Sequence, residues 1–471
     1  MRKRRVWKWL VPVAALLAFL LYFVLGAWLP NLTHRQVDES YAASAQTAVY
    51  TSDEAGCEEV YYISDNTQAM EIRLAMIESA QEEIILSTFD WRDDDSGQAV
   101  MAALLEAADR GVQVRILVDG MNTFLHLRGS AHFQALAASS NVEIKLYNPV
   151  NLLKPWTLNY RLHDKYLIAD RTAYLLGGRN TNDLFLGETT QSSNIDREIL
   201  VWQEQAGEDS SLNQLLDYFD QVWAVDSNRL LSPHASKKVT QARQELLERA
   251  EQLEQEYPQA YESVDWQAVT LATNGVALLN NGCQPSNKQP QLWAQMCQLM
   301  EQGSDILIQT PYIIANQTMY QDLTAVCAGA DSVTIMLNAP ENGANPFGCS
   351  DYLNEKDTVL SCGLGVVEWM GGRSLHTKTV LIDDSLCLVG SMNFDMRSVY
   401  LDTELMLLID CPELNRQLRD SFADMAAYGQ TVLPDGSTLS GDQLTVPQLS
   451  GGKTALYQIL RVVLRPFRYL L

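Results

Sequence analysis

Two short segments of the sequence share one pattern of residues that could do chemistry, HxKxxxxD. Its members are His163, Lys165 and Asp170 in the first copy, and His376, Lys378 and Asp383 in the second. After six further residues each copy continues with a G-[GS]-x-N segment, whose fixed residues are Gly177, Gly178 and Asn180, then Gly390, Ser391 and Asn393. The chain has only six histidines, so the matching register favours one duplicated catalytic site over two unrelated structural histidines.

These residue types suit the transfer of a phosphodiester group. Its negative charge repels nucleophiles and spreads over the oxygens during transfer, and lysines and side-chain amides stabilise that charge. One imidazole can attack phosphorus while the other protonates the leaving oxygen and then deprotonates the acceptor. We therefore predict a site that uses no metal and no cofactor, with Asn180, Ser391 and Asn393 binding the substrate.

The apolar pattern predicts that each copy lies on a β-hairpin. Dense, partly β-branched runs at 165–168 and 379–382 are each closed by an aspartate and a turn-like pair, and second runs follow at 173–176 and 386–389. Since positions i and i+2 of a strand share a face, each histidine should point the same way as its lysine. The aspartates of the motif lie beside the turn, where we expect them to stabilise the hairpin rather than touch substrate.

A third element follows each copy, an Asp-x-Glu pattern with an apolar residue after it, at 196–199 and 402–405. A carboxylate that accepts a hydrogen bond from one ring nitrogen of a histidine fixes its tautomer and supports its positive state. We therefore predict Glu198 and Glu404 as the orienting carboxylates. The alternative is a pair of charges on exposed strands.

With these residues the sequence resembles the phospholipase D superfamily, whose defining motif is HxKxxxxD, and within it the cardiolipin synthase and bacterial phospholipase D-like branch. The resemblance covers residues 61–410 and includes the segments 91–97 and 393–398. It implies two similar α/β lobes with one active site at their interface, and a covalent phosphohistidine. It also implies that His163 is the nucleophile and His376 the general acid/base.

The first copy departs from the family pattern. Many members have Gly-Ser in both copies, whereas the first copy here has Gly177-Gly178. Only Ser391 therefore offers a hydroxyl at this position, which argues against two equivalent half-sites.

The remaining sequence predicts a duplicated α/β architecture, because helices and strands alternate in the same order in each half. Helix, strand, helix and strand are expected at 70–80, 84–89, 98–110 and 112–118, and again at 292–300, 305–308, 319–327 and 332–337. The expected divisions are an anchor over 1–30, a linker over 31–60, lobes over 61–230 and 267–430, a connecting segment over 231–266 and a tail over 431–471. The connecting segment predicts an exposed helix, with a partner-binding coiled coil as the alternative.

The N-terminus predicts a membrane anchor. Residues 9–29 contain no charged side chain, which is long enough to cross a bilayer as a helix. Five basic residues precede this span, namely Arg2, Lys3, Arg4, Arg5 and Lys8. Positive charge stays cytoplasmic, so we expect a cell-membrane protein with its lobes outside the cytoplasm. A cleavable signal peptide is the alternative, although its apolar core is normally shorter.

The charge distribution bears on substrate and partners. The formal net charge is −24, with 34 basic and 58 acidic residues, and nucleic-acid binding draws its affinity from clustered lysine and arginine. We therefore expect membrane lipid, and not nucleic acid, as the partner. The last 19 residues carry no acid and four basic residues, which are Lys453, Arg461, Arg465 and Arg468. This tail is expected either to lie on an anionic membrane surface or to pack on the second lobe.

The eight cysteines match no metal-binding spacing. Cys387 falls in a predicted core strand and should be buried, while Cys349 and Cys362 are a possible disulfide pair in an extracytoplasmic chain.

Three functions fit the motifs. The first is transfer of a phosphatidyl group to the headgroup alcohol of a phospholipid such as phosphatidylglycerol, as in cardiolipin synthesis. The second is the same chemistry with water as acceptor, a phospholipase D. The third is a nucleic-acid phosphodiesterase, against which the acidity argues. The sequence leaves the oligomeric state open.

Overall fold

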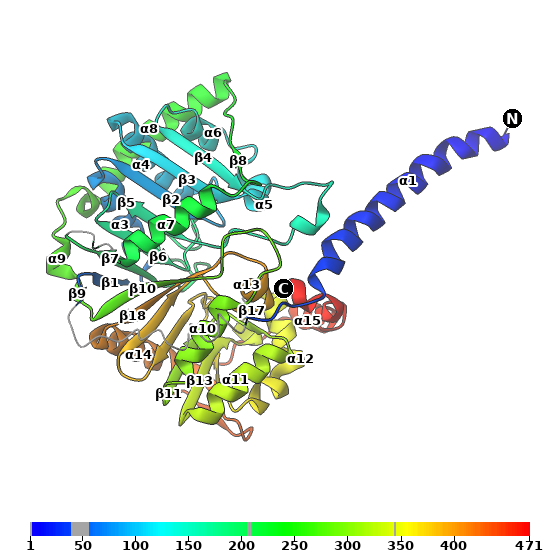
Figure 1. The fold of residues 1–471 in the computed structure, drawn as a ribbon, viewed down its shortest axis with the longest axis vertical. Coiled ribbons are helices and arrows are strands. Elements are labelled where there is room, and N and C mark those ends of the chain that lie inside the picture. Colours follow the sequence, from blue (N-terminus) through cyan, green and yellow to red (C-terminus); the bar gives the residue numbers. More distant parts are fainter. Residues whose placement is uncertain (1, 39–55, 205–206, 208, 343–344) are drawn as a thin grey trace.

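Two similar α/β lobes face each other, and a long N-terminal helix projects away from them (Figure 1). The structure is a computed structural model that describes residues 2–38, 56–204, 207, 209–342 and 345–471. Most of the predicted linker, 31–60, lies outside the described residues. The predicted α/β class with two lobes is confirmed.

Each lobe contains a nine-stranded mixed sheet. The strands of the first sheet are β1 (Glu59–Ile63), β2 (Glu83–Thr88), β3 (Gln113–Asp119), β4 (Val142–Tyr147), β5 (Tyr166–Ala169), β6 (Ala173–Gly177), β7 (Glu198–Trp202), β8 (Arg229–Leu230) and β9 (Leu271–Ala272). Those of the second are β10 (Gly275–Asn280), β11 (Asp305–Gln309), β13 (Ser332–Asn338), β14 (Gly365–Trp369), β15 (Thr379–Ile382), β16 (Leu386–Gly390), β18 (Leu405–Asp410), β19 (Gly429–Val432) and β20 (Thr438–Ser440).

Eight strands of each sheet share one topology, and each sheet has a ninth strand at the opposite end, β9 in the first and β20 in the second. The first has the order β8-β4-β3-β2-β5-β6-β7-β1-β9, and the second, from its other end, has β20-β19-β14-β13-β11-β15-β16-β18-β10. In both, three parallel strands are followed by an antiparallel hairpin, β5–β6 or β15–β16, that ends at the glycines of the motif. The duplication seen in the motifs therefore extends to eight strands of each sheet.

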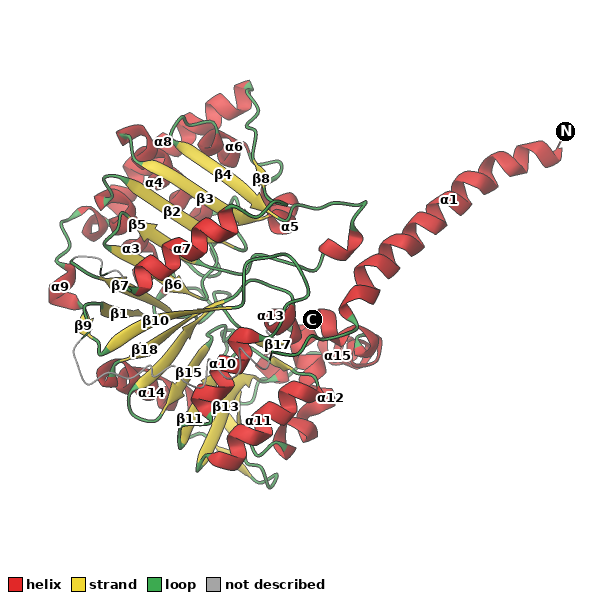
Figure 2. Cartoon of the chain, viewed as in Figure 1, coloured by secondary structure: helices red, strands yellow, loops and turns green. Residues whose placement is uncertain are grey.

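Helices cover the outer face of each sheet (Figure 2). They are α3 (Asn66–Ser79), α4 (Asp95–Arg110), α6 (Ala131–Ala137) and α8 (Lys237–Glu256) in the first lobe, and α10 (Gln291–Met300), α11 (Gln317–Gly329) and α12 (Pro346–Ser361) in the second. Side chains from the inner faces of both sheets, from α7 (Ser211–Trp223) and from α14 (Pro412–Ala426) form one shared core. The lobes are thus packed together through buried apolar contacts rather than hinged at a water-filled gap.

Local sequence explains the ends of the predicted helices. The Asp65 carboxylate caps α3 by accepting from the backbone N–H groups of Thr67 and Gln68. Asp94 caps α4, which ends at Gly111 with a φ of +104°, a conformation that glycine adopts without steric cost. The eight helices and strands predicted from periodicity are all present, with ends shifted by a few residues.

Two predictions about the elements need correction. β5 and β15 begin one residue after the motif lysines, so the histidines and lysines precede the strands instead of lying on them. The connecting helix α8 is exposed on one face only, because Leu246 and Leu253 on its other face are buried against the first lobe. It packs on α4 and α6, as an ordinary amphipathic helix does.

The cysteines are all free. Cys387 is fully buried, as predicted. The possible pair Cys349–Cys362 is not formed, because Cys349 lies in the first turn of α12 and Cys362 caps its other end. Thirteen residues of helix rise separate them by about 20 Å, whereas a disulfide requires Cα atoms within about 7 Å.

The N-terminal helix α1 (Arg2–Trp28) continues into the short 3-10 helix η1 (Leu29–Asn31). Together they contain the segment Leu10–Asn31, which is long and apolar enough to cross a membrane, with a mean hydropathy of 2.5. None of its most apolar window is buried inside the protein. The base of α1 lies beside the short helix η3 (Pro155–Thr157) and beside the C-terminal segment that follows α15 (Gly451–Val463), where Trp28 Nε1 donates to the Pro466 carbonyl at 3.4 Å.

Candidate active site

The two motifs meet where extended segments of the two lobes cross. Parallel bridges join Leu162 to Thr403 and Ile195 to Leu375. The His163 N–H donates to Thr403 Oγ1 at 3.0 Å, and the His376 N–H donates to the Ile195 carbonyl at 2.8 Å. Each histidine is therefore held by backbone contacts with the opposite lobe.

A carboxylate from the opposite lobe also binds each histidine ring. His163 Nδ1 lies 2.8 Å from Glu404 Oε1, and His376 Nδ1 lies 2.6 Å from Asp196 Oδ2. Both carboxylate side chains are completely buried. Because Nδ1 is occupied in each ring, Nε2 is the nitrogen left for chemistry.

Asp196 replaces Glu198, which we had predicted as an orienting carboxylate, and the strand register explains the error. β6 and β7 pair Gly177 with Glu198, whereas β16 and β18 pair Gly390 with Met406. The counterpart of Glu404 is therefore Asp196, two residues before Glu198. Glu198 Oε2 instead accepts from Arg73 Nη1 at 2.7 Å, within a buried ion pair.

The two lysines lie beside the histidines, as the spacing predicts. The Lys165 ammonium donates to the His163 carbonyl oxygen and lies 5.3 Å from the centre of the Phe89 ring. Lys378 Nζ lies 2.8 Å from His376 Nδ1 and 3.3 Å from Nε2. Burial lowers the pKa of Lys165 to about 8 and that of Lys378 to about 7.

Burial also shifts the pKa values of the histidines and of their partner acids. Together with the nearby lysines, it lowers the pKa of His376 to about 4 and that of His163 well below its usual range. It raises the pKa of Glu404 to about 8. For Asp196 the effect of burial is outweighed by the charge of Lys378 and the hydrogen bond with His376, so its pKa is lowered. These pKa values favour neutral imidazoles, one beside an acid with a raised pKa and one beside an acid with a lowered pKa.

The three predicted substrate-binding residues are all buried near the motifs, in different settings. Asn180 Oδ1 accepts from the Asp90 N–H at 3.3 Å. Asn393 Oδ1 is buried and has no hydrogen-bond partner among the described residues. Ser391 Oγ donates to Glu404 and accepts from the Leu405 N–H. In this arrangement Ser391 supports the orienting carboxylate.

The motif aspartates stabilise the hairpin, as their place beside the turn suggests. Asp170 and Asp383 have φ values of +51° and +47°. Asp170 Oδ1 accepts from the backbone N–H of Glu82 at 2.8 Å and from that of Glu83, the first residue of β2, at 3.0 Å. Asp383 does the same for β11 through the N–H groups of Ser304 and Asp305. Both act on strand packing and not on the reacting groups.

Sequence reasoning missed several residues that contact the histidines or their acids. Phe89 and Phe185 lie edge-on to His163 and His376, with ring centroids 4.8 and 4.9 Å apart. Ser398 Oγ donates to Glu404 at 2.5 Å. The segment 393–398 was part of the family resemblance, so Ser398 could have been found there. The two phenylalanines lie at different distances from their motifs and gave no shared pattern.

The absence of a side chain at position 178 is explained by the nearby Asp196 carboxylate. A Cβ atom at this position would lie 2.4 Å from Asp196 Oδ1, so any side chain there would displace the orienting carboxylate. The equivalent Ser391 fits because Glu404 is one methylene longer than Asp196.

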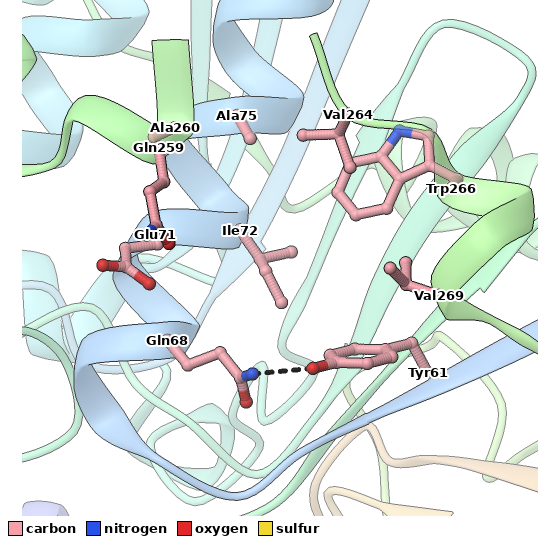
Figure 3. A pocket seen from close by; sticks show the side chains of 10 residues that line it. All are labelled: Tyr61, Gln68, Glu71, Ile72, Ala75, Gln259, Ala260, Val264, Trp266 and Val269. Atoms are coloured by element: carbon pink, nitrogen blue, oxygen red, sulfur yellow. Dashed lines mark hydrogen bonds between the residues drawn. The ribbon is translucent and has the colours of Figure 1, made fainter. Parts of the chain in front are cut away.

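No group of three or more histidine, cysteine, aspartate or glutamate side chains in the described part of the chain is arranged to hold a metal ion. A separate cavity of about 180 Å³ lies between α3 and the connecting segment (Figure 3). It is lined mainly by apolar side chains, including Ile72, Val264 and Trp266, and by none of the motif residues.

Two duplicated lobes with one buried site, in which each lobe supplies a histidine and the carboxylate for the other, define the phospholipase D class of enzymes. The sequence model of the family described as cardiolipin synthase, PLD-like domain, matches residues 74–223 and 296–426, more than half of the chain. The chain therefore belongs to this family.

Similar proteins are found among bacterial relatives. Cardiolipin synthase C of Escherichia coli is 24% identical over 413 residues, which cover 77% of this chain and 84% of that protein. The major cardiolipin synthase ClsA of Bacillus subtilis is 25% identical over 384 residues, covering 80% and 70%. The crystal structure of phosphatidylserine synthase from Haemophilus influenzae has the same fold, with a TM-score of 0.64 at 17% identity over 92% of this chain and 99% of that one.

Proposed function

We propose that this chain is a membrane-anchored phosphatidyltransferase of the cardiolipin synthase type. It transfers a phosphatidyl group, through a phosphohistidine, to the headgroup alcohol of a second phospholipid such as phosphatidylglycerol. The observation that carries the proposal is the pair of cross-lobe histidine–carboxylate contacts beside two buried lysines. The relatives named cardiolipin synthases support the choice of substrate class.

In the first half-reaction His163 is the nucleophile. Its Nε2 forms a bond to the lipid phosphorus as the bond to the headgroup oxygen breaks. His376 gives its Nε2 proton to that oxygen, and the free headgroup alcohol leaves. Lys165 and Lys378 stabilise the negative charge that spreads over the phosphoryl oxygens.

In the second half-reaction the roles of His376 reverse. It takes the proton of an incoming hydroxyl, whose oxygen attacks phosphorus as the bond to His163 breaks. With the glycerol hydroxyl of a second phosphatidylglycerol as acceptor, the products are cardiolipin and glycerol. With water as acceptor, the same steps give phosphatidic acid, which is the alternative function of a phospholipase D.

The negative charge of the bound substrate favours the protonated form of His376 that the acid step requires. Burial first, and the charge of Lys378 second, lower the pKa of His376 to about 4. A phosphodiester anion between the lysines offsets their charge, and Asp196 remains ionised against Nδ1. Substrate binding therefore raises the pKa of His376 toward the range in which it carries a proton.

The membrane setting follows from α1. We propose that the span Leu10–Asn31 anchors the chain with its basic leader in the cytoplasm and both lobes outside. In this position the enzyme meets its lipid substrates in the membrane that holds it.

The test is a lipid product analysis with the purified full-length protein. Vesicles that contain phosphatidylglycerol should yield cardiolipin and glycerol, with phosphatidic acid as a minor product. His163→Ala and His376→Ala should each lower turnover by on the order of 10²-fold or more, whereas His132→Ala, at an ion-paired site on α6, should not. Phosphatidic acid as the sole product would favour the hydrolase, and cleavage of DNA or RNA without any lipid product would refute the proposal.

A substrate with an activated leaving group separates the two histidine roles. Departure of p-nitrophenolate needs no proton, so the His376→Ala variant should retain far more activity on a p-nitrophenyl phosphodiester than the His163→Ala variant. The reverse order would exchange the assignments.

A further inference from the structure

The base of α1 is fixed to two other parts of the chain. The Tyr22 hydroxyl donates to the Leu153 carbonyl at 2.7 Å, and Asn159 Nδ2 donates to the Ala27 carbonyl at 2.7 Å. Trp28 contacts Phe467, with ring centroids 6.0 Å apart. The loop between β4 and β5 and the C-terminal segment therefore both lie against the membrane-proximal end of α1.

The β4–β5 loop follows α1 beyond its base. Tyr22 is nine residues from Asn31, the end of the apolar span, which corresponds to about 13 Å of helix rise. Leu153 is bound at the level of Tyr22 and is 74% exposed. Leu152 and Trp156, on the same loop, are also exposed. If α1 crosses the bilayer, the tip of this loop lies at the depth of its outer hydrocarbon.

The helix α15 buries Tyr457 against the second lobe and still leaves several apolar side chains exposed on its other face. Arg461 donates to Asn354 of α12 at 2.9 Å, and η6 (Arg465–Leu470), which follows, places Arg468 against Asp351. Four apolar side chains point outward instead, namely Leu456, Ile459, Val462 and Val463. A helix exposed to water normally turns its apolar face toward the protein, so the outer face of α15 suits an apolar medium.

We propose that the tip of the β4–β5 loop and the outer face of α15 insert into the leaflet from which α1 emerges. Leu152, Leu153, Trp156, Leu456, Ile459 and Val463 form this membrane-docking surface. The occupant is lipid because the surface is continuous with the anchor through the contacts of Tyr22, Asn159 and Trp28. The inference rests on the proposed function in one respect, the assignment of α1 as a membrane span.

This surface places the catalytic site close to the bilayer. The loop that carries Trp156 reaches His163 seven residues later, a distance of at most about 25 Å along an extended chain. Arg397 connects the C-terminal segment, the β4–β5 loop and the active site. Its guanidinium donates to the carbonyls of Leu470 and Asn159 and to Asp402. A lipid can then present its phosphate to the histidines while its acyl chains stay near the membrane.

The first experiment compares two lipid formats with the full-length protein. Leu152→Glu/Leu153→Glu should lower turnover on phosphatidylglycerol vesicles by about tenfold or more, because two charges would have to enter the apolar region. Turnover on the same lipid dispersed in detergent should stay within about twofold of wild type, which also shows that the variant is folded. The control is Leu439→Glu on β20, a leucine at the far edge of the second sheet whose exposed fraction lies between those of Leu152 and Leu153. It should change turnover in neither lipid format. Equal vesicle activity of both variants would overturn the proposal.

The second experiment does not depend on catalysis. A photoreactive benzoylphenylalanine at position 153 of the protein in phosphatidylglycerol vesicles should cross-link to lipid, whereas one at position 439 should not. Cross-linking at position 153 to a second copy of the chain, or to nothing more than at position 439, would refute insertion. Lipid cross-linking without phospholipid turnover by the wild type would instead refute the proposed function and leave the docking surface supported.

Discussion

The two halves of the active site have the same backbone and different carboxylates. In one half Glu404 binds His163 and accepts from Ser391 and Ser398. In the other half Asp196 binds His376, and Gly178, which has no side chain, occupies the position equivalent to Ser391. A short acid with a glycine and a long acid with a serine are two ways to fill the same space around a histidine.

The difference is also electrostatic. Burial raises the pKa of Glu404 to about 8, whereas the charge of Lys378 and the hydrogen bond with His376 keep the pKa of Asp196 low despite burial. An ionised partner favours a protonated histidine, and a partner that holds a proton favours a neutral one. This asymmetry supports His376 as the acid and His163 as the nucleophile, and it teaches that a duplicated motif can be specialised through the partners of its histidines.

The largest expected effect comes from removing the ionised acid. Asp196→Asn should lower kcat by on the order of 10²-fold, because the amide cannot stabilise the protonated form of His376 that general acid catalysis requires. Glu404→Gln should cost less, about tenfold, because Glu404 is largely protonated near neutral pH. Steady-state kinetics on detergent-dispersed lipid measure both, and equal losses would contradict the comparison.

Glu198→Gln is the matched control for the corrected assignment. It removes the buried charge opposite Arg73, so it should lower the free energy of unfolding by about 3 kcal/mol or more. Its kcat should stay close to wild type at a temperature where the variant is folded. A loss of kcat as large as that of Asp196→Asn would restore Glu198 as an orienting residue.

The sequence predicted the parts of the site that repeat at a fixed spacing. His163, Lys165, His376 and Lys378 lie where the motif register indicates, next to hairpins that end at the predicted glycines. The orienting acid of the first lobe could not be found this way, because the loop from Asn180 to its acid is longer than the loop from Asn393 to Glu404. Only the strand pairing shows that Asp196, and not Glu198, is the counterpart of Glu404.

Features that depend on packing between distant segments could not be predicted from the sequence either. The spacing of apolar residues in α15 predicted an amphipathic helix, but it did not show which face would meet α12. The packed face is the one on which Tyr457 is buried and Arg461 donates to Asn354. Likewise, no local pattern shows that the loop carrying Leu153 lies against Tyr22 of α1.

Substitutions of Gly178 and Ser391 test whether the size of these residues is matched to the length of the neighbouring carboxylates. Gly178→Ala should lower kcat by roughly tenfold, because its Cβ would meet the Asp196 carboxylate and overpacking costs about 1–3 kcal/mol. Ser391→Ala removes a hydrogen bond to Glu404 and should cost only about two- to tenfold. The double variant Gly178→Ser/Asp196→Glu, which copies the second half-site, should recover part of the loss caused by Gly178→Ser alone. Strictly additive effects would show that the two positions do not interact.

The smallest expected effect is a shift in the pH dependence of kcat/KM, which reports ionisations of the free enzyme. Burial lowers the pKa of Lys378 to about 7 and that of Lys165 to about 8, so each lysine is charged below its pKa and neutral above it. Because the charged form binds the phosphodiester, kcat/KM should fall as pH rises through this range, and the half-site of Lys378 should lose its charge first. Lys378→Arg keeps that charge at every accessible pH, so the fall in its pH profile, normalised to its own maximum, should move up by about one pH unit. A wild-type kcat/KM that rises between pH 7 and 8 would contradict the assigned charge states of both lysines.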